Sequence, residues 1–313
     1  ESPLLIEDVK DLLIEKRLIE ENFLSGIGAT KADFTDERKN TLQELWGTLK
    51  GHTDDIESFW AFQDNEGFLT IVSGSGSKDK TIKIWKEDEE HNFNVRTLEG
   101  HSEAISALHA FQDKEGLLTI ISGSDDHTIK IWKEDEKHNF NVRTSRDHKS
   151  KYETIRSFRI FQDKEELLTI VFGGSTSTIK IWKEDKWHNF NVRTLEGHYN
   201  QISSLHAFQD SEGLLTIVSG EEMRDASIKI WKEDKWHNFN VRTLEGHTNN
   251  IYSLHTFQDN EGLLTIVSGS RDNTIKIWKE DKTHNFNVRT LEGHTDNIYS
   301  LHTFQDNEGL LTI

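Results

Sequence analysis

The sequence has no cysteine and a single proline in 313 residues. Without cysteine there are no disulfide bonds and no thiolate metal ligands, which fits a reducing compartment, and we expect a cytoplasmic protein. Long apolar runs are also missing, since no stretch approaches the roughly 18 residues that a membrane-spanning helix needs. No secretory signal peptide is visible either. We therefore expect no membrane association and no disulfide framework.

Basic residues are in the minority, with 37 Lys and Arg against 55 Asp and Glu and a formal net charge of -18. A surface that binds a polyanion needs clustered cations, so we expect no nucleic-acid binding. Much of the acid lies in two recurring segments, Gln-Asp-(Asn/Lys/Ser)-Glu and Lys-Glu-Asp. In a four-stranded meander both would be loops at the same end of the sheet. The sequence therefore predicts one negatively charged end.

Internal repetition is what the sequence has in abundance. The segment (Thr/Ser)-Ile-Lys-Ile-Trp ends at Trp85, Trp132, Trp182, Trp231 and Trp278, so that successive copies are 47, 50, 49 and 47 residues apart. A histidine precedes each tryptophan by 31 to 34 residues, at His52, His101, His148, His198 and His247. A further one, His294, begins an incomplete copy. Repetition at this period indicates a repeat architecture with five full units and a fragment.

Each copy contains four predicted strands, illustrated by the fifth. Ile251–Phe257 and the short apolar run Leu263–Val267 are separated by a turn-rich segment, as expected for a first strand and a strand buried on both faces. Thr274–Trp278 alternates as a strand does, and Asn285–Leu291 follows a charged loop. Four strands in about 47 residues indicate one blade of a β-propeller. The fold class predicted is all-β.

With Gly-His at its beginning and Trp near its end, each copy resembles a WD repeat, and the resemblance covers residues 41–313. Every copy has Trp-Lys where the family signature has Trp-Asp. The resemblance implies a propeller of four-stranded blades that needs no cofactor. It also implies a protein-interaction scaffold or recognition module that is not an enzyme.

The resemblance further implies a structural tetrad in each blade, made by the leading His, a Ser on the second strand, an Asp in the next turn and the Trp. The matching sets are His52, Ser73, Asp79, Trp85; His101, Ser122, Asp126, Trp132; His198, Ser219, Asp225, Trp231; and His247, Ser268, Asp272, Trp278. His, Ser and Asp could form a nucleophilic triad. Because the set recurs in four copies, we interpret it as buried polar groups that satisfy one another.

The N-terminal residues do not follow the repeat. Residues 3–24 mix strong helix formers with Leu5, Val9, Leu12 and Phe23 at helical spacing, and Gly26 and Gly28 follow. We expect a helical N-terminal extension at 1–40 before a propeller at 41–313.

The two ends of the repeat region are complementary. Residues 43–52 match the end of a fourth strand, whereas Ile298–Phe304 and Leu310–Ile313 match a first and a second strand. We therefore expect six blades, the sixth composite, with its third strand from about residues 28–36 or absent. The chain starts without Met and ends within a predicted strand, so we expect a longer natural protein, in which seven blades would be favoured.

Copy 3 diverges from the others. It begins with Asp147-His148, carries three extra residues before Ile155, and has Phe172 and Thr176 at the tetrad Ser and Asp positions. Copies 1 and 4 carry two-residue insertions in the turn before the third strand. Such loops lie on faces where partners bind.

Two groups of residues are candidates for partner binding. The first is a basic window in copy 3, Arg143, Arg146, Lys149, Lys151, Arg156 and Arg159, together with Tyr152. It would suit an acidic or phosphorylated segment of a protein or peptide. The alternative is that these cations pair with neighbouring acids. The second group is Trp187 and Trp236, which stand in the loop after the third strand where other copies have Glu, Lys or Thr. Exposed tryptophans favour an interface, although they could instead pack on their own blades.

Two other functions remain open from the sequence. The chain could be the sensor or regulatory part of a larger multidomain protein. It could also be a metal-binding or enzymatic propeller that uses the repeated loop histidines, His91, His138, His188, His237 and His284, with nearby carboxylates. Because this motif recurs in every copy at the start of a strand, we favour loop structure over metal binding. The sequence predicts no oligomeric state.

Overall fold

The computed structural model describes residues 49–145, 154–163, 165–210, 212–223, 226–259, 261–301, 303–305 and 311–313. These residues form β-strands joined by turns, and no helix occurs among them. Within the same ranges, nothing is long and apolar enough to cross a membrane as a helix. The chain divides into two compact units, residues 1–147 with 305–312 and residues 148–304 with 313.

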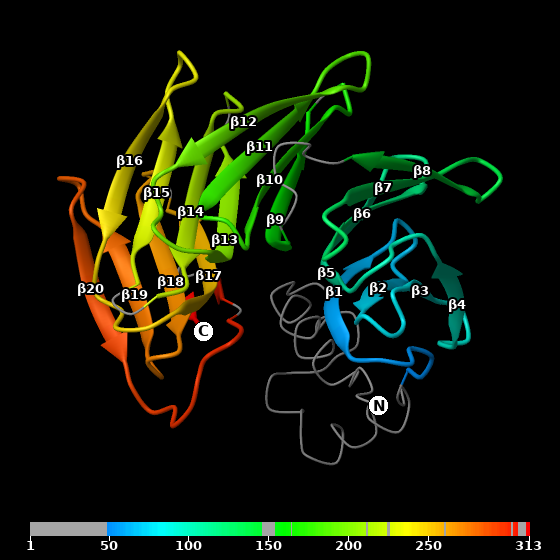
Figure 1. The fold of residues 1–313 in the computed structure, drawn as a ribbon, viewed down its shortest axis with the longest axis horizontal. Coiled ribbons are helices and arrows are strands. Elements are labelled where there is room, and N and C mark those ends of the chain that lie inside the picture. The colour runs from blue at the N-terminus through cyan, green and yellow to red at the C-terminus, as the bar shows by residue number, and fades with distance from the viewer. Residues whose placement is uncertain are drawn as a thin grey trace, which may run out of the picture. The chain divides into compact units, whose positions relative to one another are not determined.

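The first unit contains two four-stranded antiparallel sheets (Figure 1). The strands of the first sheet are β1 (Ile56–Gln63), β2 (Leu69–Ser75), β3 (Ile82–Glu87) and β4 (Phe93–Leu98). Those of the second sheet are β5 (Ile105–Gln112), β6 (Leu118–Ser124), β7 (Ile129–Glu134) and β8 (Phe140–Ser145).

The second unit contains three sheets of the same kind. The strands of the third sheet are β9 (Ile155–Gln162), β10 (Leu168–Gly174), β11 (Thr178–Glu184) and β12 (Phe190–Glu196). The fourth sheet has β13 (Ile202–Gln209), β14 (Leu215–Glu221), β15 (Ile228–Glu233) and β16 (Phe239–Leu244). The fifth has β17 (Ile251–Gln258), β18 (Leu264–Ser270), β19 (Ile275–Glu280) and β20 (Phe286–Leu291). In all five sheets the order across the sheet follows the order along the chain, so each repeat is a meander.

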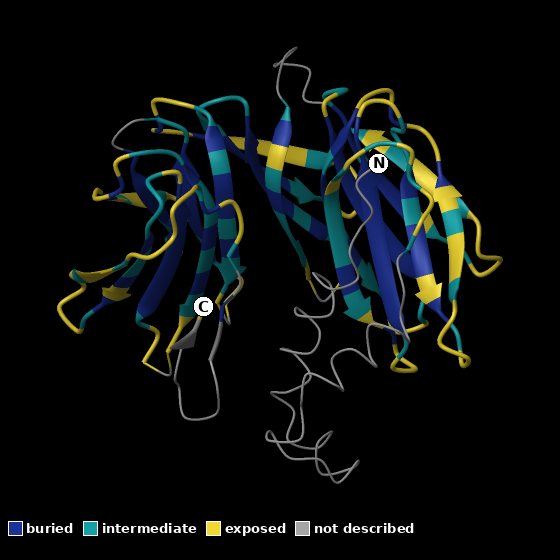
Figure 2. Cartoon of the chain, turned by 90° about the horizontal axis from the view of Figure 1, so that it is seen from below, coloured by how far each residue is buried: buried dark blue, intermediate teal, exposed yellow. Residues whose placement is uncertain are grey.

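Burial follows the sequence pattern of each strand (Figure 2). Every residue of β2, β6 and β18 is buried, as predicted from the apolar run with no exposed face. The fourth strands are the most exposed, and the valine at the middle of each, such as Val95 or Val241, is about half exposed. The second strand is thus an interior strand of its sheet and is covered on both faces, whereas the fourth is an edge strand that is partly exposed to solvent.

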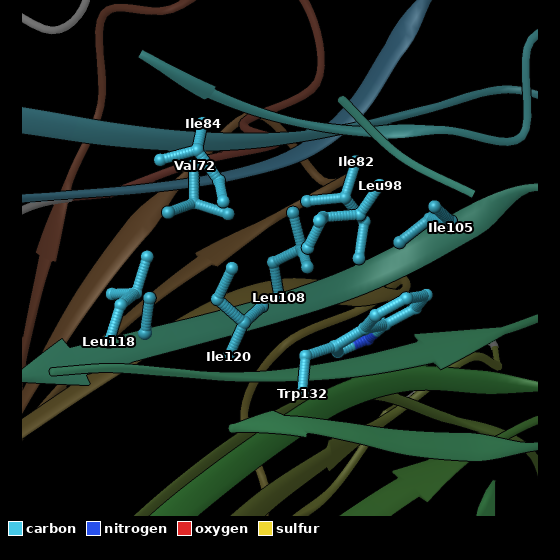
Figure 3. Packing of buried hydrophobic residues seen from close by; sticks show 10 residues of the cluster. Val72, Ile82, Ile84, Leu98, Ile105, Leu108, Leu118, Ile120 and Trp132 are labelled. Atoms are coloured by element: carbon cyan, nitrogen blue, oxygen red, sulfur yellow. The ribbon is translucent and has the colours of Figure 1, made fainter. Parts of the chain in front are cut away.

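Neighbouring sheets within a unit pack face to face. In the first unit one cluster joins the two sheets (Figure 3), and it contains Val72, Ile82, Ile84, Leu98, Ile105, Leu108, Ala110, Leu118, Ile120 and Trp132. In the second unit two similar clusters join the third sheet to the fourth and the fourth to the fifth. The close approach of the fourth and fifth sheets needs a glycine at position 220, because a Cβ on Gly220 would lie 2.8 Å from Ile251 Cγ2. Within each unit, neighbouring repeats therefore bury apolar faces against one another, as repeat proteins do.

The expectations about the chain ends need correction. The described residues form five four-stranded sheets rather than six blades. In the described part of the last copy, the strands are β21 (Phe304–Gln305) and β22 (Leu311–Thr312), which form a two-stranded sheet. Ile298 is buried against the fifth sheet, but the residues around it are not a strand. The helix predicted at 3–24, the strand at 28–36 and most of the segment 43–52 lie outside the described residues.

Candidate functional site

The predicted tetrad is formed in copies 1, 2 and 5. In copy 5, Trp278 Nε1 donates a hydrogen bond to Ser268 Oγ at 2.8 Å, and Ser268 Oγ lies 2.7 Å from His247 Nε2. His247 Nδ1 lies 2.7 Å from Asp272 Oδ2. The same contacts link Trp85, Ser73, His52 and Asp79, and also Trp132, Ser122, His101 and Asp126. The tetrad ties the start of a repeat to its second strand, its turn and its third strand.

The electrostatics of the tetrad are those of a structural network. Burial lowers the pKa of His247 despite the opposing effect of Asp272, so the imidazole is neutral. Burial alone would raise the pKa of Asp272, but hydrogen bonds from Thr274, His247 and the Thr248 N–H lower it to about 2. Ser268 is fully buried and already bonded to the tryptophan. The buried Ser268 hydroxyl is not accessible to a substrate, and its hydrogen bonds pair the buried Trp278 N–H and the His247 imidazole of this tetrad.

In copy 4 the predicted acid of the tetrad, Asp225, lies outside the described residues. Among the described residues, Glu221, the last residue of β14, is the acid that lies beside His198. Glu221 Oε2 lies 3.2 Å from His198 Nδ1, close enough for an ion pair although not aligned for a hydrogen bond. Its carboxylate accepts bonds from the Tyr199 N–H at 3.1 Å and the Ser227 hydroxyl at 2.6 Å. Burial would raise the pKa of Glu221, but the contacts with His198, Ser227 and Tyr199 lower it to about 2.

Copy 3 lacks this network, as its sequence predicts. Phe172 occupies the serine position and its ring contacts the Trp182 ring edge to face, with centroids 5.2 Å apart. Trp182 Nε1 is buried and has no hydrogen-bond partner among the described residues. His148, the leading histidine of this copy, lies outside them. The third sheet thus has apolar packing where the other sheets have a polar network, and the Trp182 indole N–H is unpaired among the described residues.

A second set of contacts recurs in every sheet. The loop histidines were expected to have a role in loop structure, but their pairing with the glutamate that ends the third strand was not predicted. The glutamate that ends the third strand, for example Glu280, accepts a bond from the N–H that begins the second strand, at 3.0 Å for Leu264. Its other oxygen lies 3.0 Å from His284 Nδ1 in the following turn. Equivalent His–Glu pairs, 2.6 to 3.1 Å apart, are His91–Glu87, His138–Glu134, His188–Glu184 and His237–Glu233. The invariant spacing of Trp-Lys-Glu and His could have indicated it.

These loop histidines also occupy a special backbone conformation in the turn. All five adopt a left-handed conformation, with φ between 61° and 63°, a region in which histidine is enriched among residues other than glycine. In the part of the chain that the structure describes, no group of three or more His, Asp or Glu side chains is arranged to hold a metal ion. The His–Glu pair therefore anchors a turn.

The basic window of copy 3 is only partly described. Arg146, Lys149, Lys151 and Tyr152 lie outside the described residues, and Arg143 lies on β8 in the first unit. Arg156 lies on β9 in the second unit, where its guanidinium forms an ion pair with Glu222 in the inserted turn of copy 4. For Arg156 the alternative of pairing with a neighbouring acid is therefore observed.

Arg159, also on β9, is different. Among the described residues its only hydrogen-bond or ion-pair partner is the Phe158 carbonyl, 2.9 Å from Nη1. The side chain is partly buried, and this burial lowers the pKa of Arg159 to about 10. The guanidinium is still charged at neutral pH, because that pKa lies well above 7.

Trp187 and Trp236 lie in equivalent turns of the third and fourth sheets, after β11 and β15. Their side chains are 70% and 71% exposed, so they do not pack on their own sheets. Each turn is held by an aspartate, since the N–H of Trp187 donates to Asp185 Oδ1 and that of Trp236 to Asp234 Oδ1, both at 2.9 Å. The Nζ of the preceding lysine lies 4.4 Å from the ring centroid in both turns. Both indoles are therefore presented to solvent on fixed turns, each beside a cation.

Comparison with known families agrees with this geometry. The family described as WD domain, G-beta repeat matches residues 43–86, 92–133, 189–232 and 238–279, which together exceed half of the chain. The matched stretches contain the tetrad tryptophans of copies 1, 2, 4 and 5 and leave out residues 134–188, which hold the first three strands of the divergent copy 3. A search of curated proteins finds no match.

Proposed function

The chain belongs to the WD-repeat family, and from this premise we propose that it is a non-enzymatic binding platform for a protein or peptide. WD repeats typically mediate protein–protein interaction. The histidines, serines and acids that might suggest catalysis are used in the tetrads and in the turn anchors. Fold alone does not identify a binding surface, which has to be argued from particular side chains.

The observation that carries the proposal is the exposure of Trp187 and Trp236. An indole that is 70% exposed leaves a large apolar area in water, which burial against a partner would remove. Tryptophan is also among the residues that contribute most to binding energy at interfaces. Because the Asp185 and Asp234 turns already fix the backbone, little conformational entropy is lost on binding.

The chemistry of this surface indicates the chemistry of its partner. Lys186 and Lys235 stand over the indole faces, so each turn offers an apolar ring beside a positive charge. A protein segment that carries apolar and acidic side chains would complement both. Copies 1, 2 and 5 have Glu90, Lys137 and Thr283 in place of the tryptophans, so only the third and fourth sheets offer this combination.

The proposal is tested by replacing both tryptophans with threonine, the residue that copy 5 has at this position. Proteins captured by the wild type would be identified, and the affinity of one purified partner would then be measured for both forms. We expect the double variant to bind the partner at least about tenfold more weakly, as for the loss of an interface hot spot. We expect its free energy of unfolding to change by no more than about 0.5 kcal/mol, because surface substitutions rarely do more.

A matched control is Val241→Thr, which alters a half-exposed side chain on the edge strand of the same fourth sheet. This variant should bind as the wild type does. Equal binding by the wild type and the double tryptophan variant would refute the proposal.

A further inference from the structure

Among the described residues, Arg159 has no anionic partner, although the chain has 18 more acidic than basic side chains. This partly buried arginine has a backbone carbonyl as its single hydrogen-bond partner in that part of the chain. A guanidinium has five N–H donors, so most of the hydrogen-bonding capacity of Arg159 is unused. Keeping a partly desolvated charge unpaired is costly for the folded protein. A charge maintained at such a cost is a candidate for ligand recognition.

The position of Arg159 in its sheet supports this interpretation. In the strand pairing it lies opposite Val171, as His206 lies opposite Val218 and His255 opposite Val267. Strands β9, β13 and β17 are neighbours in this order (Figure 1), so these three side chains form a row across the first strands of the second unit. The corresponding residues of the first unit are Trp60 and His109. Only the third sheet places a permanent cation there.

The neighbours in the row do not neutralise Arg159. His206 and His255 lie with ring centroids 4.9 Å apart, and His206 Nδ1 is 2.6 Å from Thr256 Oγ1. Burial, together with the charges of Arg159 and His255, lowers the pKa of His206 to about 2. His206 is therefore neutral and can share hydrogen bonds with a ligand, but it cannot compete with Arg159 for an anion.

We propose that Arg159 is the anchor of an oxyanion-binding site on β9, with His206 of β13 beside it. The ligand group is a carboxylate or a phosphoryl group carried by a peptide, because the guanidinium fork matches the oxygen pairs of both. The site deepens the binding-platform function proposed above and rests on it. It lies on the first strands of the sheets, whereas Trp187 and Trp236 lie in the turns after the third strands, so the two can be tested independently.

The test uses the full chain and three synthetic hexapeptides, namely hexaglutamate, one phosphoserine flanked by glycines, and hexaglutamine. Binding would be measured by isothermal titration calorimetry to the wild type, to Arg159→His and to Arg156→Ser. Both substitutions introduce the residue of copies 2 and 4 at the same register, so both suit the fold. Arg156 is the matched control because its charge is already paired with Glu222.

The wild type should bind hexaglutamate or the phosphoserine peptide, and the tighter of the two identifies the source of the oxyanion. It should not bind hexaglutamine. Arg159→His should weaken binding by about tenfold or more, whereas Arg156→Ser should change it by less than about threefold. Arg159→Lys, which keeps the charge but loses the fork, should bind at an intermediate level.

A second readout needs no variant. The imidazole NMR signals of His206 should shift when the bound peptide is added to the wild type. Absence of binding by either anionic peptide overturns the site while leaving the tryptophan surface untouched. Equal losses in Arg159→His and Arg156→Ser would also overturn it, because they would show general attraction to positive charge.

Discussion

At the scale of single residues, the tetrad is a hydrogen-bond network whose members can be exchanged if the bonds are kept. In copy 4, Glu221 reaches from the end of β14 to His198, a role that Asp79, Asp126 and Asp272 play from the following turn. Copy 3 shows the opposite case, in which Phe172 provides no acceptor and the Trp182 N–H has no partner in the described part of the chain. An unpaired buried donor costs about 1 to 3 kcal/mol, so copy 3 should be less stable than the repeats that form the tetrad.

This difference predicts unequal effects of the same substitution. Trp182→Phe removes an indole N–H that has no hydrogen-bond partner among the described residues, whereas Trp278→Phe removes a hydrogen bond of 2.8 Å to Ser268. Both tryptophans are 2% exposed, so the loss of packing should be similar. We expect Trp278→Phe to reduce the free energy of unfolding by about 1 to 2 kcal/mol more than Trp182→Phe does, as measured by urea denaturation.

Equal destabilisation by the two substitutions would contradict the hydrogen-bond account of the tetrad. Trp231→Phe provides a check, because Trp231 also donates to a serine, at 2.9 Å from Ser219 Oγ, and should behave as Trp278→Phe does.

The tetrads of copies 1, 2 and 5 were predicted in full because their spacing is regular, and in copy 4 the predicted contacts of His198, Ser219 and Trp231 are formed, while Asp225 lies outside the described residues. The contact of Glu221 with His198 was not predicted, because a sequence does not show how far the side chain of a Glu at the end of a second strand reaches. The Gly-Glu pair at 220–221, where other copies have Gly-Ser or Gly-Gly, was the available signal.

At the scale of elements, the strands follow directly from the sequence pattern. The short apolar runs became the fully buried second strands, and the alternating Ile-Lys-Ile-Trp segments became the third strands. What the pattern could not give was the contact between first strands, since Arg159, His206 and His255 are about 48 residues apart in sequence. Their row depends on how neighbouring sheets pack.

The row of first strands predicts a dependence of stability on pH. The pKa of His206 falls to about 2 in the folded protein, because of burial and the charges of Arg159 and His255, against about 6.5 in an unfolded chain. Below pH 6.5 the unfolded state therefore binds more protons, and the free energy of unfolding falls as the pH falls from about 6.5 towards 2.

Replacing His206 with glutamine removes the contribution of His206 to the pH dependence of stability. When the pH is lowered from about 7.5 to about 5.5, the free energy of unfolding of the variant should fall by about 1 kcal/mol less than that of the wild type. Urea denaturation at a series of pH values would measure this difference. A variant with the same slope as the wild type in this range would show that His206 is protonated in the folded state.

At the scale of the whole molecule, the repeat number and the class of fold could be read from the sequence, whereas the ends could not. A sixth, composite blade was inferred from complementary strand fragments, yet the last copy forms only the short β21 and β22 in the described part of the chain. Two-residue strands have few ladder hydrogen bonds and no third strand to pair with, and an isolated pair of strands is only marginally stable.

The candidate binding residues were predictable only as departures from the repeat. Trp187, Trp236 and Arg159 stand out because other copies have different residues in the same places. The sequence could not distinguish Arg156 from Arg159, because the difference lies in Glu222, which pairs with one of them and not the other. Divergence from the repeat thus indicated the candidate residues, and the contacts of the described residues distinguished Arg159 from the paired Arg156.

The central claim, that the chain binds a protein partner through the exposed tryptophans, is tested most directly by tryptophan oxidation footprinting. In the free chain Trp187 and Trp236 should oxidise fastest, while the five tetrad-position tryptophans, each 2% exposed, should be protected. In a purified complex with a captured partner, the account predicts that Trp187 and Trp236 become protected as well. Unchanged oxidation of both tryptophans in the complex would contradict it.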